Sequence, residues 1–211
     1  MFNVIFDMDG TLLDTQRICI PAWEYAGRLQ GIEGAGECIP FVCGMNYAGW
    51  SGYLLEHYPG IDVLSFAEAA RDYIVKNLVV NFKKGGGELL EFLKQKGVKI
   101  GLASGSSRAS VEHHLNEVGV LEYFDAIVAG PEVENGKPAP DIFLLTAEKM
   151  GVKPETCFVI EDSSNGIRAG FNAGMKCIGI PDVARFDEDA KAMLHRECEN
   201  LLEVIDILKA L

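Results

Sequence analysis

Two carboxylates follow a short apolar run near the start of the sequence. Residues 4–6 are Val, Ile and Phe, which is typical of a strand buried on both faces, and Asp7 and Asp9 come directly after them. Carboxylates are rarely buried without a partner, so this place needs a cation or a polar crevice. Open α/β sheets have their ligand crevices at the carboxyl ends of strands. Asp7 and Asp9 are therefore candidates for chemistry, although a surface turn with two acids fits this short pattern equally well.

Polar groups also follow two later apolar runs. Residues 98–103 are predicted to form a strand that ends at Ser104 and Gly105, and another strand runs into Glu161 and Asp162. If these strands are parallel neighbours, their ends meet at one crevice. Four carboxylates crowded there would raise one another's pKa unless a cation held them. Oxygen ligands without His or Cys close by in the sequence favour Mg²⁺.

Two further features suit a phosphate group. Lys137 stands just before a predicted helix and offers a point charge to a phosphate oxygen. Ser104 and the amides of the turn at Gly105 lead into another helix N-terminus, which favours anions. Each residue alone also has a plainer interpretation: Ser104 as a helix cap, Lys137 as a solvated loop lysine, and Glu161 with Asp162 as a cap beside an exposed acid.

The order of the predicted elements indicates an α/β protein with a parallel sheet and helices on both faces. After residue 84, strands at 98–103, 126–129, 157–160 and 176–180 alternate with helices at 88–96, 110–118, 141–150 and 167–173, and a last helix follows at 203–211. The segment 182–200 has no clear pattern. The three glycines at 85–87 fit a hinge or a plain loop before a helix.

The segment 15–84 shows no pattern of a buried strand. It has three helical stretches, at 16–31, 46–57 and 65–81, and it holds both tryptophans, Trp23 and Trp50. We therefore predict a Rossmann-like core domain formed by residues 1–14 and 85–211, with a helical cap domain inserted at 15–84.

Composition narrows the class of protein. The 211 residues, of which 48% are hydrophobic, are enough for a substantial core. No apolar run approaches the roughly 20 residues of a membrane span, and the chain begins with a strand pattern and no basic leader, so we expect no membrane partner. A net charge of −12 argues against nucleic acid as a partner. The six cysteines are not spaced as a zinc site, and we expect reduced thiols in the cytoplasm.

Four segments, in this order, resemble the motifs of the haloacid dehalogenase-like hydrolase superfamily. They are DMDGT at 7–11, Ser104 after an apolar strand, GKPAPD at 136–141 and EDSSNGIRAG at 161–170. The last is especially similar to the β-phosphoglucomutase and phosphoglycolate phosphatase branch. The resemblance spans residues 1–14 and 85–180, and all four motifs in order make coincidence improbable.

The resemblance implies a role for each core residue. Asp7 would attack phosphorus to form an aspartyl-phosphate, and Asp9 would act as general acid and then general base. Mg²⁺ would be held by Asp7, the main-chain carbonyl of Asp9 and Asp162, with help from Glu161. Ser104, Gly105 and Lys137 would hold the transferring phosphoryl group. The resemblance also implies a monomer that acts on a small phosphorylated metabolite.

The cap departs from the mutase pattern of this branch. That pattern has a His in the first cap helix and an Arg in a cap loop, whereas this chain has Cys19 and, in the loop around 44–47, Tyr47. A sugar-phosphate mutase must also hold a second phosphate, yet the cap carries few cations. Simple hydrolysis is thus the favoured function, with Arg17, Arg71 and Lys76 as candidate contacts to the substrate.

Other activities stay open as alternatives. They are a β-phosphoglucomutase-like mutase and a non-catalytic protein that binds phosphorylated ligands. Dehalogenation is disfavoured, because Asp9 and Lys137 beside a metal site serve phosphoryl transfer. Phosphonate cleavage would need a cap lysine that forms an imine, and the sequence does not show whether Lys76 has that role.

Overall fold

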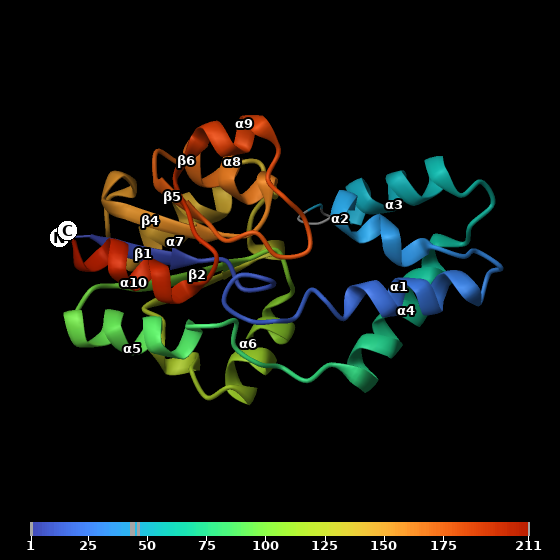
Figure 1. The fold of residues 1–211 in the computed structure, drawn as a ribbon, viewed down its shortest axis with the longest axis horizontal. Helices are drawn as coiled ribbons and strands as arrows, with labels where there is room; N and C mark the ends of the chain where they lie inside the picture. Colours follow the sequence, from blue (N-terminus) through green and yellow to red (C-terminus); the bar gives the residue numbers. More distant parts are fainter. Residues whose placement is uncertain (1, 43–44, 46, 211) are drawn as a thin grey trace.

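The computed structural model describes residues 2–42, 45 and 47–210 (Figure 1). Residues 43, 44 and 46, which belong to the cap loop compared above with the mutase pattern, lie outside the described residues. Within the described part of the chain, no helix has the length and apolar character that crossing a membrane requires.

A six-stranded parallel sheet forms the centre of the molecule, in the order β3-β2-β1-β4-β5-β6. The predicted α/β class is therefore confirmed. The strands are β1 (Asn3–Phe6), β2 (Ile100–Ser104), β3 (Ala126–Ala129), β4 (Cys157–Glu161), β5 (Lys176–Gly179) and β6 (Leu194–Glu197). Strand β1 lies between β2 and β4, so Phe6 stands beside both Leu102 and Ile160. The three predicted strand ends are consequently neighbours.

Helices cover both faces of the sheet (Figure 1). The two-residue period of β1 explains why: Val4 and Phe6 enter one hydrophobic core and Ile5 enters the other, all fully buried. The first core is closed by α5 (Gly86–Lys96), α6 (Arg108–Glu117) and α10 (Leu201–Lys209). The second is closed by α7 (Asp141–Met150), α8 (Ser164–Asn172) and α9 (Glu188–Met193).

Four helices gather to one side of the sheet, at the right of Figure 1, around a third hydrophobic core. They are α1 (Cys19–Arg28), α2 (Ile39–Val42), α3 (Tyr47–His57) and α4 (Val63–Asn77). Trp23 and Phe66 meet edge to face in this core, with ring centroids 5.2 Å apart. Asp62 caps α4 by accepting from the amides of Leu64 and Ser65.

Two crossings of the chain join these helices to the sheet, and they run side by side. The amide of Lys83 in the second crossing donates to the carbonyl of Leu12, just before the first, at 2.9 Å. The side chain of Asp182, which follows β5, is fully buried, and its Oδ1 accepts from Nε of Arg17 in the first crossing at 3.0 Å and from Nζ of Lys83 in the second at 2.6 Å. We call this arrangement the Asp182 bridge. That the cap domain spans 15–84 stays a prediction.

The structure adds elements that the sequence pattern did not show. The unassigned segment 182–200 holds α9 and the edge strand β6, whose residues are mostly exposed and thus lack an apolar signal. Helix α5 begins at Gly86, two residues earlier than predicted, because glycines carry no helix signal. Two of the three glycines therefore lie in a helix. Pro21 lies in the first turn of α1, where proline is tolerated.

Candidate active site

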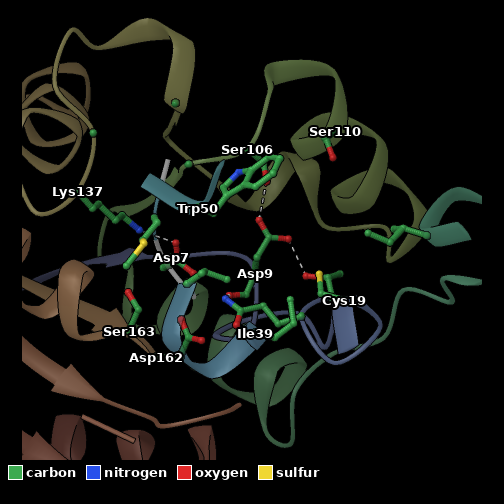
Figure 2. Close-up of a pocket in the computed structure, with 18 of the residues that line it drawn as sticks. Asp7, Asp9, Cys19, Ile39, Trp50, Ser106, Ser110, Lys137, Asp162 and Ser163 are labelled. Carbon is green, nitrogen blue, oxygen red and sulfur yellow. Dashed lines mark hydrogen bonds and ion pairs between the residues drawn. The ribbon is translucent and has the colours of Figure 1, made fainter. Parts of the chain in front are cut away.

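The ends of β1, β2 and β4 open onto one cavity of about 730 Å³ between the sheet and the cap helices. Figure 2 shows Asp7, Asp9, Lys137 and Asp162 around it. Asp7 retains only 6% exposure, so it is a buried carboxylate that still reaches the cavity. Glu161 also lines the cavity. The core residues that the motifs singled out are thus neighbours in space.

Lys137 ties two of these carboxylates together. Its Nζ donates to Oδ1 of Asp7 at 2.5 Å and to Oε1 of Glu161 at 2.6 Å, and more weakly to the carbonyl of Ala103 at 3.3 Å. Burial works against the ammonium group, but the two carboxylates outweigh it and raise the pKa of Lys137. The lysine is therefore a permanent positive charge whose position is set by its partners.

The negative charge of three neighbouring carboxylates exceeds the positive charge of Lys137. Oxygens of Asp7, Glu161 and Asp162 lie within 4.8 Å of one another, and all three residues are buried. Burial, with Glu161 and Asp9 adding to it, raises the pKa of Asp7 to about 7 despite Lys137. Burial and the neighbouring acids likewise hold the pKa of Asp162 well above its usual range. A cluster of oxygen donors with surplus negative charge fits a hard divalent cation such as Mg²⁺.

Two glycines allow the main chain to lie against these acids. Gly10 has φ +83°, and a Cβ there would stand 2.5 Å from Oδ2 of Asp162. A Cβ on Gly166, in the first turn of α8, would stand 1.8 Å from Oε1 of Glu161. The other oxygen of Glu161 accepts from the amide and the hydroxyl of Ser163, at 2.7 and 2.9 Å. The acids are therefore held in place by packing as well as by hydrogen bonds.

Both carboxylate oxygens of Asp9 accept hydrogen bonds. Thr15, at the start of the first crossing, donates to Oδ1 at 2.6 Å, whereas Ser106 and Ser104 donate to Oδ2 at 2.8 and 3.2 Å. The main-chain carbonyl of Asp9, an expected metal ligand, accepts from Nε2 of Gln16 at 2.8 Å. The carboxylate is thereby oriented by groups from both the core and the cap crossing.

Ser104, the last residue of β2, and Ser106, two residues later, occupy different places. Ser104 is fully buried, and its hydroxyl accepts from the amide of Ser106 at 3.0 Å, so it shapes the turn. Ser106 and Gly105 line the cavity. The sequence pattern pointed to Ser104 and not to Ser106, although the position of Ser106 two residues further along, in the turn after a strand, is a signal for it.

The three cationic side chains proposed as substrate contacts lie in different places. Arg71 lines the cavity, and Lys76 does not. Arg17 is held in the Asp182 bridge. The sequence pattern did not indicate that Trp50 and other aromatic residues of the cap line the cavity. It also did not point to His114 of α6, which lines the cavity with its buried Nδ1 unpaired.

Comparison with known proteins places this geometry in a family. The family model described as haloacid dehalogenase-like hydrolase matches residues 3–174. A phosphorylated carbohydrates phosphatase from Thermotoga maritima is 31% identical over 100% of this chain and 98% of its own length. A β-phosphoglucomutase from Bacillus subtilis is 34% identical over 85% of this chain and 83% of its own. The crystal structure of a β-phosphoglucomutase from Clostridium difficile superposes with a TM-score of 0.81 at 26% identity, covering 100% of this chain and 96% of that one.

Proposed function

This chain belongs to the haloacid dehalogenase-like hydrolase family, and we propose that it is a Mg²⁺-dependent phosphatase of small phosphorylated metabolites that works through an aspartyl-phosphate on Asp7. The observation that carries the proposal is the contact of Lys137 with Asp7 and Glu161 inside the buried acidic cluster. A nucleophilic carboxylate, an oriented second carboxylate and a fixed cation stand at one end of a cavity large enough for a metabolite.

The first step makes Asp7 the nucleophile. A carboxylate oxygen of Asp7 forms a bond to phosphorus, the bond from phosphorus to the ester oxygen breaks, and the electron pair leaves with that oxygen. Asp9 donates a proton to the departing oxygen as general acid. Lys137 holds Asp7 through Oδ1 and offsets its charge, which favours the ionised form that attacks.

The second step restores the enzyme. Water attacks the phosphorus, Asp9 accepts a proton from the water, and the bond to Asp7 breaks, so that one ester and one water give one alcohol and one phosphate. Asp7, Glu161, Asp162 and the Asp9 carbonyl would hold Mg²⁺. When bound, Mg²⁺ supplies charge stabilisation to the phosphoryl group during transfer.

Hydrolysis is favoured over the mutase activity named for two of the proteins compared. A mutase has to bind a second phosphate at the far end of the cavity. Among the described cap residues, Arg71 supplies the one cation that lines the cavity, and its side chain is 72% exposed. Arg17 already serves Asp182. The cap therefore offers little positive charge for a second phosphate.

The test is hydrolysis of p-nitrophenyl phosphate with and without Mg²⁺. Asp7→Asn should lower kcat by at least roughly 10³-fold, and acid quenching of the wild-type protein should trap a phosphorylated peptide that contains residue 7. Asp206→Asn, on the exposed surface of α10, is the matched control and should retain activity. Full activity in Asp7→Asn, or activity unaffected by a chelator, would contradict the proposal.

A further inference from the structure

The cap side of the active-site cavity is largely apolar. Among the described residues of the segment 15–84, ten hydrocarbon, aromatic or thioether side chains line it, including those of Trp23, Ile39, Trp50, Phe66 and Ile74. The described residues of the same segment include four polar lining residues: Thr15, Gln16, Cys19 and Arg71. Thr15 and Gln16 are bonded to Asp9 and thus belong to the catalytic end.

The two remaining polar residues offer little to a substrate with many hydroxyl groups. Burial, with a contribution from Asp9, raises the pKa of the Cys19 thiol to about 11, so Cys19 is a neutral and weak hydrogen-bonding group. The side chain of Arg71 is 72% exposed and lies 3.9 Å from Asp72. Its guanidinium group is therefore largely in water.

Aromatic rings make up part of this wall. Trp50 is half-buried, with Tyr47 against it at 4.8 Å between ring centroids and Trp23 at 5.7 Å, both edge to face. Figure 2 shows Trp50 lining the cavity that also contains Asp7 and Asp9. Edge-to-face packing holds the indole in place while part of its surface stays open. A flat, apolar group is the natural partner of such a surface.

From this wall we infer that the part of the substrate's leaving group that faces the cap is an apolar ring, rather than the hydroxyl-bearing face of a sugar. The inference rests on the proposed function, because it needs the phosphate at Asp7. Each hydroxyl buried against this wall without a partner would cost roughly 5- to 150-fold in affinity. A hydrocarbon ring loses nothing there and gains from leaving water.

Three esters of primary alcohols test the inference with matched leaving-group chemistry: 2-phenylethyl phosphate, ethyl phosphate and glucose 6-phosphate. With Mg²⁺, kcat/KM for 2-phenylethyl phosphate should be at least about 10-fold higher than kcat/KM for ethyl phosphate. It should be about 100-fold higher than kcat/KM for glucose 6-phosphate. Equal or faster hydrolysis of glucose 6-phosphate, abolished by Asp7→Asn, would overturn the inference and leave the phosphatase standing. No hydrolysis of any of the three by protein that hydrolyses p-nitrophenyl phosphate would overturn the inference alone, whereas no hydrolysis of p-nitrophenyl phosphate either would remove both.

Substitutions in the cap test whether Trp50 is the source of the preference for 2-phenylethyl phosphate. Trp50→Ala should lower the ratio of kcat/KM for 2-phenylethyl phosphate over ethyl phosphate by about 10-fold, and Trp50→Leu by less. Tyr25→Ala is the control, since Tyr25 is a cap aromatic that packs on Tyr73 away from the cavity, and it should keep the ratio. Calorimetry of 2-phenylethyl phosphate binding to Asp7→Asn should show a negative heat-capacity change that Trp50→Leu reduces. An unchanged ratio in a folded Trp50→Ala protein would refute the inference.

Discussion

Metal-free protein is expected to become less stable as the pH rises from 5 to 7, because Asp7 must then ionise among other buried acids. The pKa of Asp7 is about 7 in the folded protein, against an ordinary value of 3.8. Between these values the folded chain keeps a proton that the unfolded chain has lost. Folding therefore takes up a proton, and the free energy of unfolding falls as the pH rises.

The size of the effect follows from the same two values. Each pH unit in this interval costs about 1.4 kcal/mol, so Asp7 alone removes about 2 kcal/mol between pH 5 and pH 7. Asp162, whose pKa is also raised, acts in the same direction. Glu132 has a lowered pKa of about 2 and changes its protonation mostly below this window. The lowered pKa of His195 adds an opposite slope near its own titration.

Urea unfolding at pH 5, 6 and 7, in excess EDTA and in excess MgCl₂, measures the effect. Mg²⁺ should stabilise the protein more at pH 7 than at pH 5, because it binds the ionised carboxylates. Asp162→Asn should flatten the slope in EDTA and raise the stability at pH 7, whereas the exposed control Asp206→Asn should keep the slope. Metal-free stability that stays constant or rises from pH 5 to 7 would refute this reasoning.

Three further predictions concern the site and the cap. Asp9→Asn should lower kcat by roughly 10²- to 10⁴-fold with little change in the thermal midpoint, as steady-state kinetics and calorimetry would show. Gly166→Ala should cost about 1–3 kcal/mol in urea unfolding, because the new methyl group overlaps Glu161, and a stability equal to wild type would count against the packing described. Fluorescence of Trp23 and Trp50 should change when Mg²⁺ and a phosphate analogue bind together, since both residues line the cavity; a constant spectrum at saturation would argue against it.

The sheet was predictable because its central strands are buried on both faces. Residues 4–6 and 157–160 are apolar throughout, and β1 and β4 are adjacent. The edge strand β6 escaped prediction because its sequence is Leu-His-Arg-Glu and most of it faces solvent. Helix α2, with the 3₁₀ turn at Ala35–Cys38 before it, was also missed, since elements this short have no periodicity to detect.

The acidic end of the site was predictable for a related reason. Parallel strands place their carboxyl ends together, so Asp7 and Asp162 had to meet once the strand order was right. The orientation of single side chains in the cap was not accessible in this way. Arg17 turns to Asp182, which lies 165 residues further along the chain, while Arg71 lines the cavity. Only the tertiary packing of the crossings decides between such positions.

The Asp182 bridge has a consequence for exchanging modules between relatives. Both of its cations, Arg17 and Lys83, belong to the inserted segment, but the acid belongs to the sheet side. A chimera that received a foreign segment without cations at these two positions would retain a fully buried, uncompensated carboxylate, at a cost of about 3–5 kcal/mol. Neutralising Asp182 together with such a graft should therefore recover much of the lost stability.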